Sequence, residues 1–367
     1  MTDLLLRIRD GAWLDEQSYS PLAWAVPGII PEGFGLFTGP PKAGKSWAAL
    51  GVALAVASGG AAFGRIPVGP ARPVLLLALE DGERRLQERS RHLLCGEPIP
   101  KGFQFVVTST PAEVLELVTG WLAVVGHSRP LVVLDTLGRV LPAALPGEGA
   151  YQRDYRVGAR LKGLVDEHPG ACLLAVHHVR KASTIEGDWM DSTSGTNGLN
   201  GAADFTVNLA RPRGETSGIL RVTGRDVPDG EYAVTNVSGS WTLDGRSLDE
   251  AAKVAAQAKV TAGLGDRSAE ILAFVARADE PVAAADVEAA LNMSDARRYL
   301  ARLVEAGRLH RAARGRYTLR TPFPSVPLSQ TDTPETDPVN QDALERDNGT
   351  DGTPTPRDCH LLGGGAA

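Results

Sequence analysis

Short apolar runs alternate with amphipathic stretches along the chain up to about Gly245. The runs predict strands at 35–38, 74–79, 131–134, 171–176, 205–209 and 219–223. Helical patterns lie at 47–57, 82–94 and 151–168. Buried strands that alternate with helices are typical of a mainly parallel sheet covered on both faces, so we expect an α/β domain over residues 1–248.

The pattern changes after residue 248. Residues 249–264 are Ala-rich and predict a helical or flexible linker. Residues 265–320 carry three helical patterns at 268–278, 284–291 and 295–306, followed by a hairpin pattern that turns at Arg314-Gly315. Three helices and a wing predict a winged helix-turn-helix domain. Residues 321–367 are rich in Pro, Thr, Asp and Gly, and we expect a disordered acidic tail.

Charge is unevenly distributed. The net charge of the 367-residue chain is −6, and the tail alone, with eight acidic residues against two arginines, accounts for that excess. Whole-chain charge therefore does not indicate a nucleic-acid binder. The three cysteines, Cys95, Cys172 and Cys359, form no C-x-x-C pair, so neither a disulfide framework nor a zinc site is expected. With neither a signal-peptide pattern nor a spanning apolar run, we expect a cytoplasmic protein without a membrane partner.

One motif carries explicit chemistry. Residues 39–46 fit the phosphate-binding pattern G-x-x-x-x-G-K-[ST], and are Gly39, Pro40, Pro41, Lys42, Ala43, Gly44, Lys45 and Ser46. The glycines let the backbone wrap an anion, and the N–H groups point inward at a helix N-terminus. Lys45 is predicted to reach the β- and γ-phosphates of ATP and Ser46 to ligate Mg²⁺. The alternative is a chance glycine turn.

Carboxylates follow two of the predicted strands. Asp135 ends the 131–134 run and is the candidate Walker B ligand of Mg²⁺, or else a turn-capping residue. Glu80-Asp81 follows the 74–79 run. We favour Glu80 as the base that polarises the attacking water, with Asp81 as the second choice, and the alternative is a cap for the next helix. Ligands bind beyond the carboxyl ends of parallel strands, so these side chains are expected at one edge.

The polar residues that follow the 171–176 run are candidates for contact with a phosphate or with nucleic acid. His177-His178 predict a γ-phosphate sensor or a polar pair at a strand end, because adjacent strand residues point in opposite directions and make a poor metal pair. The glycine-rich stretch 180–201 begins with Arg180 and Lys181, which suit contact with a nucleic-acid backbone or a plain surface loop. On the third helix of the C-terminal unit, Arg297 and Arg298 predict DNA binding, with protein contacts as the alternative.

The motifs together resemble those of the RepA-type hexameric replicative helicases, which are RecA-like ATPases. The resemblance covers about residues 27–234 and rests on three segments after the P-loop. These segments are Leu79-Glu80-Asp81 with Arg89 nine residues after Glu80, Leu134-Asp135-Thr136-Leu137, and His177-His178-Val179-Arg180-Lys181.

The resemblance implies a RecA-like core in a homo-oligomeric ring, a hexamer, with ATP between subunits and single-stranded DNA in the channel. It implies that Glu80 is the catalytic base, that Arg89 helps at the phosphate site and that His178 is the sensor. Residues 180–201 become the channel loop. A neighbouring subunit is expected to supply an arginine finger, for which Arg225 is the first candidate and Arg221 the second. The family carries an arginine nearer to 204–205, where this chain has none.

Three functions are compatible with these features. The first is a DNA-dependent ATPase that works as a ring helicase in replication. The second is a recombination or repair ATPase of the same fold that forms filaments. The third is an ATP-switched DNA-binding regulator or loader.

Overall fold

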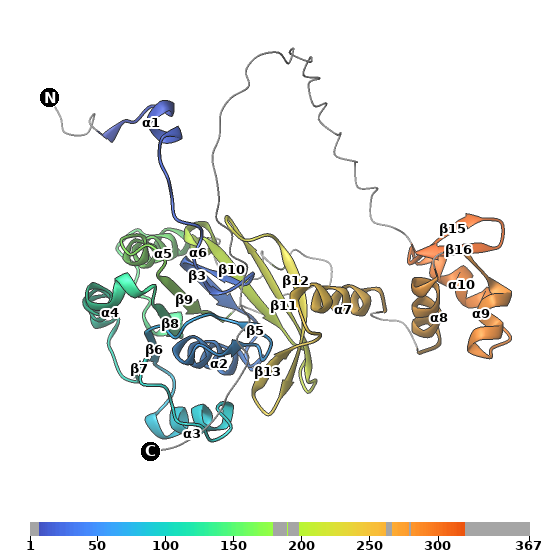
Figure 1. Cartoon of the computed structure of the whole chain (residues 1–367), viewed down its shortest axis with the longest axis horizontal. Helices are drawn as coiled ribbons and strands as arrows, with labels where there is room; N and C mark the ends of the chain where they lie inside the picture. The colour runs from blue at the N-terminus through green and yellow to red at the C-terminus, as the bar shows by residue number, and fades with distance from the viewer. Residues whose placement is uncertain (1–6, 179–188, 190–197, 262–265, 279, 320–367) are drawn as a thin grey trace, which may run out of the picture. The chain divides into compact units, whose positions relative to one another are not determined.

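A nine-stranded sheet organises the main body of the protein (Figure 1). The computed structural model describes residues 7–178, 189, 198–261, 266–278 and 280–319. The strand order is β13-β12-β11-β10-β3-β9-β8-β6-β7. Six strands run parallel: β3 (Gly33–Thr38), β6 (Val74–Ala78), β7 (Phe103–Val106), β8 (Leu131–Asp135), β9 (Cys172–Val176) and β10 (Phe205–Ala210). The predicted mainly parallel α/β sheet is confirmed.

Three antiparallel strands extend this sheet beyond β10. They are β11 (Ser217–Gly224), β12 (Gly230–Val237) and β13 (Ser240–Leu243). The sequence pattern predicted β11 but neither β12, β13 nor the edge strand β7. These strands are half-exposed, so they lack the continuous apolar run that marks a buried parallel strand.

The central strands are apolar because both faces are covered. Alternate residues of β6 belong to two separate cores: Leu76 packs into the core that contains α2 (Lys45–Ser58), and Leu77 into the core formed with α4 (Pro111–Val125) and α5 (Ala150–Asp166). The other elements of this body are α1 (Gly11–Asp15), β1 (Trp24–Val26), β2 (Ile30–Pro31), β4 (Ala61–Ala62), β5 (Ile66–Pro67), α3 (Glu83–Leu93), η2 (Gly126–Ser128), η3 (Leu137–Arg139), α6 (Gly198–Ala202) and α7 (Leu248–Thr261).

One helix was missed, and another matches the helical alternative predicted for its segment. α4 was not predicted, although its start carries a signal: Thr110 and Glu113 form a reciprocal capping box with Pro111 between them. The segment expected as a linker is largely the helix α7. Its Ala251 and Ala255 are 0% and 2% exposed, because this Ala-rich face packs on β12.

The segment after residue 265 has a small core of its own. Its helices match the predicted ranges closely, and a short strand β14 adds a third strand to the predicted hairpin, giving the order β14-β16-β15. The elements are α8 (Asp266–Arg277), β14 (Val282–Ala283), α9 (Ala284–Leu291), α10 (Ala296–Glu305), β15 (Leu309–Ala313) and β16 (Arg316–Leu319). The predicted tail, 321–367, lies outside the described residues.

Candidate nucleotide-binding site

The loop between β3 and α2 has the backbone that an anion-binding loop requires. Gly39 has a φ of +148°, and a Cβ there would lie 2.4 Å from the carbonyl oxygen of Leu209. Gly44 has a φ of +101° and precedes the first residue of α2. Both positions therefore need glycine, one for space and both for conformation. The N-terminus of α2 opens directly onto this loop, as expected for a phosphate cradle.

Lys45 is held inside the loop. It is 3% exposed, and its Nζ donates to the carbonyl oxygens of Gly39 at 2.7 Å and Pro40 at 3.0 Å. Burial lowers the pKa of Lys45 to about 8, although the charges of Asp135 and Glu80 act in the opposite direction. The negative charges near the ammonium group therefore do not fully offset the cost of burying it. A bound phosphate would add negative charge at this point.

Asp135 and Ser46 meet at the carboxyl end of β8. Burial raises the pKa of Asp135, and the nearby Ser46 hydroxyl acts in the opposite direction. Glu80 and Asp81 push the same pKa upward, because like charges disfavour ionisation. A hydroxyl and a carboxylate oxygen are ligands that Mg²⁺ accepts when phosphate oxygens and water complete its shell. Within the described residues, no cluster of three or more His, Cys, Asp or Glu could hold a metal unaided.

The neighbouring carboxylates Glu80 and Asp81 have different surroundings. Asp81 accepts from Arg85 at 2.9 Å and from Arg89 at 2.6 Å, so both of its oxygens are engaged. Glu80 is 46% exposed, with Oε1 3.8 Å from Nε of Arg139 and Oε2 4.0 Å from Nε2 of His178. Asp81 is no helix cap either, because α3 begins after Gly82 without a side-chain cap. Of the two, Glu80 is the more exposed carboxylate and has the longer contacts.

The two histidines make different contacts. His178 places Nδ1 3.0 Å from Nζ of Lys45, while the backbone N–H of His177 donates to the carbonyl of Phe37. Burial lowers the pKa of both imidazoles, and the charge of Lys45 lowers that of His178 further. His178 therefore stands between Lys45 and Glu80 as a neutral ring.

A cavity of about 380 Å³ opens over Lys45, Ser46 and His178. Arg89 lines it and lies 5.1 Å from the ring centroid of Trp47. Sequence reasoning missed its far wall, where Arg211 donates to the Lys42 carbonyl at 3.0 Å and lies 5.5 Å from the ring of Trp241. The lining residues are Lys42, Gly44, Lys45, Ser46, Trp47, Arg89, His178, Arg211, Asn236, Ser238 and Gly239.

The arginine-finger candidates lie outside this cavity in their own chain. Arg225 follows β11 at the opposite edge of the sheet, where it is 63% exposed, 4.0 Å from Asp204. Arg221 pairs with Glu231 at 3.3 Å.

The residues predicted to bind DNA lie partly within the described residues. Arg180 and Lys181 lie outside the described residues, and Arg297 and Arg298 are exposed on α10. The expectation that 180–201 is all loop is wrong at its end. Residues 198–201 begin α6, because Gly198 allows this helix to pack closely on α5.

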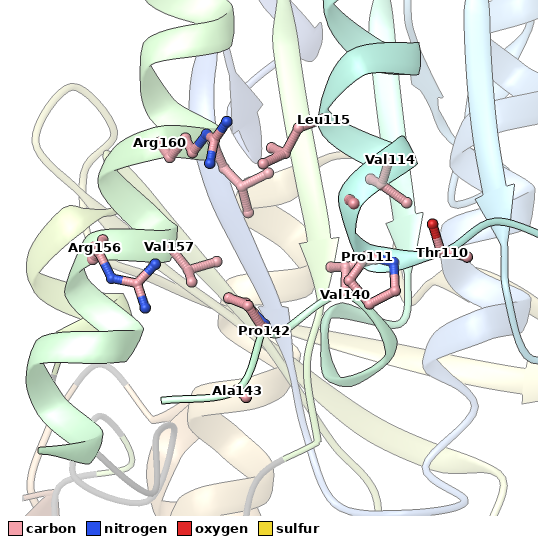
Figure 2. Close-up of a pocket in the computed structure, with 12 residues that line it drawn as sticks. Thr110, Pro111, Val114, Leu115, Val140, Pro142, Ala143, Arg156, Val157 and Arg160 are labelled. Atoms are coloured by element: carbon pink, nitrogen blue, oxygen red, sulfur yellow. The ribbon is translucent and has the colours of Figure 1, made fainter. Parts of the chain in front are cut away.

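A larger cavity, about 540 Å³, lies between α4 and α5 (Figure 2). Its lining is mainly apolar, and one of its two arginines, Arg156, is bonded to Glu148 at 2.7 and 2.8 Å. None of the residues predicted to bind ATP, metal or DNA lines it. Cavity volume therefore does not identify the nucleotide-binding site in this molecule.

Comparison with known proteins agrees with this geometry. Residues 5–184 match the model of a family described as "AAA domain", a span that contains the P-loop, Glu80, Asp135 and His178. The match supports an ATPase. No curated protein matches the chain.

Two solved structures are similar to the chain at 13% identity. "ATPase Domain of G40P" has a TM-score of 0.47 and covers 58% of this chain and 85% of its own. "The Structure Of A DnaB-Like Replicative Helicase And Its Interactions With Primase" has a TM-score of 0.45 and covers 57% of each chain. The fold itself is a mainly parallel sheet with the P-loop motif directly after β3. In the described residues, no helix has the length and apolar character to span a membrane.

Proposed function

We propose that this protein is an ATP-driven DNA helicase or translocase of RepA type that acts in DNA replication. The observation that carries the proposal is the convergence of Lys45, Asp135, Glu80 and His178 at the P-loop, where Lys45 and His178 line the cavity. Together these residues offer an anion cradle, a metal ligand, a base and a polar group between them, which is the set that phosphoryl transfer needs.

Each residue has a distinct role in hydrolysis. The loop N–H groups and Lys45 hold the phosphates, and Ser46 and Asp135 hold Mg²⁺, which neutralises charge on the phosphate oxygens when bound. Glu80 orients the attacking water and accepts its proton as the terminal phosphate is released as inorganic phosphate. His178 hydrogen-bonds to the γ-phosphate and reports its loss to the segment that follows.

The remaining parts of the proposal concern assembly and DNA. Arg225 of a neighbouring subunit supplies the arginine finger. The active form is therefore a ring of subunits, a hexamer. A finger supplied in trans is worth ~10³–10⁵ in rate. Arg180 and Lys181 contact single-stranded DNA in the channel. We place the activity in the cytosol, on the evidence of the cysteine pattern.

Strand displacement with Lys45→Ala as the control tests the proposal. The wild-type chain should separate a forked duplex only with ATP and Mg²⁺, and Lys45→Ala should abolish both hydrolysis and unwinding. Unwinding by Lys45→Ala would refute the proposed ATP-driven motor activity. A wild-type chain that hydrolyses ATP but does not unwind DNA would also refute it. Filaments in place of rings by negative-stain microscopy would instead indicate the recombination or repair ATPase.

A second candidate is an ATP-switched DNA-binding regulator or loader. Its support is the small C-terminal core, where α10 carries Arg297, Arg298 and Arg302 exposed on one element. We propose residues 265–320 as a winged helix that binds DNA through Arg297 and Arg298. If the protein is such a regulator, it should bind DNA in a sequence-specific way, and Arg297→Ala/Arg298→Ala should abolish that binding. It should also hydrolyse ATP slowly and should not unwind DNA.

A further inference from the structure

Two tyrosines form an exposed stacked pair near the start of α5. Tyr151 and Tyr155 are one helical turn apart, and their ring centroids lie 6.3 Å from each other with an interplanar angle of 12°. The two residues are 53% and 47% exposed. The other ring pairs among the described residues each include a buried or half-buried ring. Two large flat apolar faces are thus held parallel at the surface.

The adjacent helix α6 leaves these rings uncovered. A Cβ on Gly198 would lie 2.4 Å from the carbonyl oxygen of Tyr151, so α6 lies directly against α5. On the same helix, a Cβ on Gly201 would lie 3.8 Å from Cδ2 of Tyr155 and 3.9 Å from the hydroxyl oxygen of Tyr151. Gly201, whose Cβ position lies within 4 Å of both tyrosines, therefore has no side chain to cover them.

Positive charge lies beside the rings. Arg225 is 63% exposed, and its Nη2 donates to the carbonyl oxygen of Gly201 at 3.5 Å. The carboxylate on the intervening turn of α5, Asp154, is 6% exposed and pairs with Arg153 at 2.9 Å. In a subunit whose Arg225 is not engaged at a neighbouring ATP site, an anionic backbone that approached the rings would meet its guanidinium group and no bare carboxylate from this turn.

We propose that Tyr151 and Tyr155 form a stacking platform for the bases of single-stranded DNA. Bases stack on aromatic side chains irrespective of sequence because every base has a π-face, and a nearby cation holds the phosphates. This inference rests on the proposed DNA-dependent function. It adds a contact to the bases, whereas Arg180 and Lys181 were assigned to the backbone. A sequence-independent grip on bases suits a protein that moves along a strand.

Fluorescence anisotropy with labelled (dT)₂₀ tests the platform on the full-length chain. Tyr151→Leu/Tyr155→Leu should weaken binding by about 5- to 100-fold, since loss of base stacking has effects of that order. The slope of log K against log salt should stay unchanged, because that slope reports phosphate contacts. Tyr151→Phe/Tyr155→Phe should restore binding, and the matched control Tyr19→Leu, at an exposed tyrosine elsewhere, should have no effect.

Each adverse result has a separate meaning. If the wild type does not bind (dT)₂₀, the proposed DNA function fails and the platform with it. If the wild type binds and the double leucine variant binds equally well, only the platform is overturned. If the leucine variant loses its oligomeric state by sedimentation, the tyrosines form a subunit contact and the platform is also overturned.

A second measurement needs no substitution. An oligonucleotide with 5-iodouracil should crosslink to Tyr151 or Tyr155 on irradiation, because an aromatic ring stacked on the base favours that reaction. Crosslinks confined to other residues would contradict the proposal.

Discussion

The buried Lys45 predicts that ATP affinity falls as the pH rises from 7.5 to 9.5. With its pKa lowered to about 8, the ammonium form of Lys45 makes up about three quarters of the free protein at pH 7.5 and about 3% at pH 9.5. Only that form attracts phosphate, and apparent affinity scales with the competent fraction, so Kd should rise about 25-fold. The sign follows from the direction of the shift: a lysine with an ordinary pKa stays charged across this range.

The imidazole in contact with Lys45 does not titrate in the same window. Burial and Lys45 itself lower the pKa of His178 from 6.5, so the ring is already neutral at pH 7.5. The assay is titration with a fluorescent ATP analogue, and calorimetry in two buffers at pH 9 should show uptake of about 0.9 proton per nucleotide. Lys45→Arg is the control, because a guanidinium group stays charged throughout. A flat Kd for the wild type, with no proton uptake, would refute the reasoning.

Three further predictions follow from contacts in and around the site. Glu80→Gln should lower the rate of ATP hydrolysis by ~10²–10⁴, whereas Asp81→Asn should lower it far less, because both oxygens of Asp81 are already paired with arginines. Asp204→Ala should lower the free energy of unfolding by about 1–3 kcal/mol in urea titrations, since it leaves the half-buried Lys162, 2.7 Å away, without that partner. Arg225→Ala should bind ATP normally but hydrolyse it slowly, and mixing it with Lys45→Ala protein should restore hydrolysis at hybrid interfaces.

Each of these outcomes has a counterpart that would contradict it. Equal losses for Glu80→Gln and Asp81→Asn would remove the distinction between the two carboxylates. An unchanged urea midpoint for Asp204→Ala would mean that the pair contributes nothing net, and Lys162→Met, which leaves Asp204 accepting from the Phe34 N–H at 3.0 Å, measures the same pair from its other side. Inactive mixtures of the Arg225 and Lys45 variants would exclude a finger supplied in trans.

Sequence alone determined the parts of this protein that depend on local pattern. The continuous apolar runs at β6, β8 and β9 identified buried strands, because a strand covered on both faces has no polar alternation. The P-loop pattern identified the phosphate cradle, because positive-φ positions such as Gly39 and Gly44 require glycine. Parallel strands end at one edge, so the residues that follow them could be predicted to lie there together.

Only the tertiary structure decided which of these residues make contact and what encloses them. The bond between Lys45 and His178 joins positions 133 apart, and the far wall of the cavity comes from Arg211 and the β12–β13 turn. Spacing could not choose between Glu80 and Asp81, because that choice depends on how α3 packs beside the strand end. The i, i+4 tyrosines were visible in the sequence, but their exposure depends on the glycines of α6. Such contacts are set by packing between distant segments, which local periodicity does not encode.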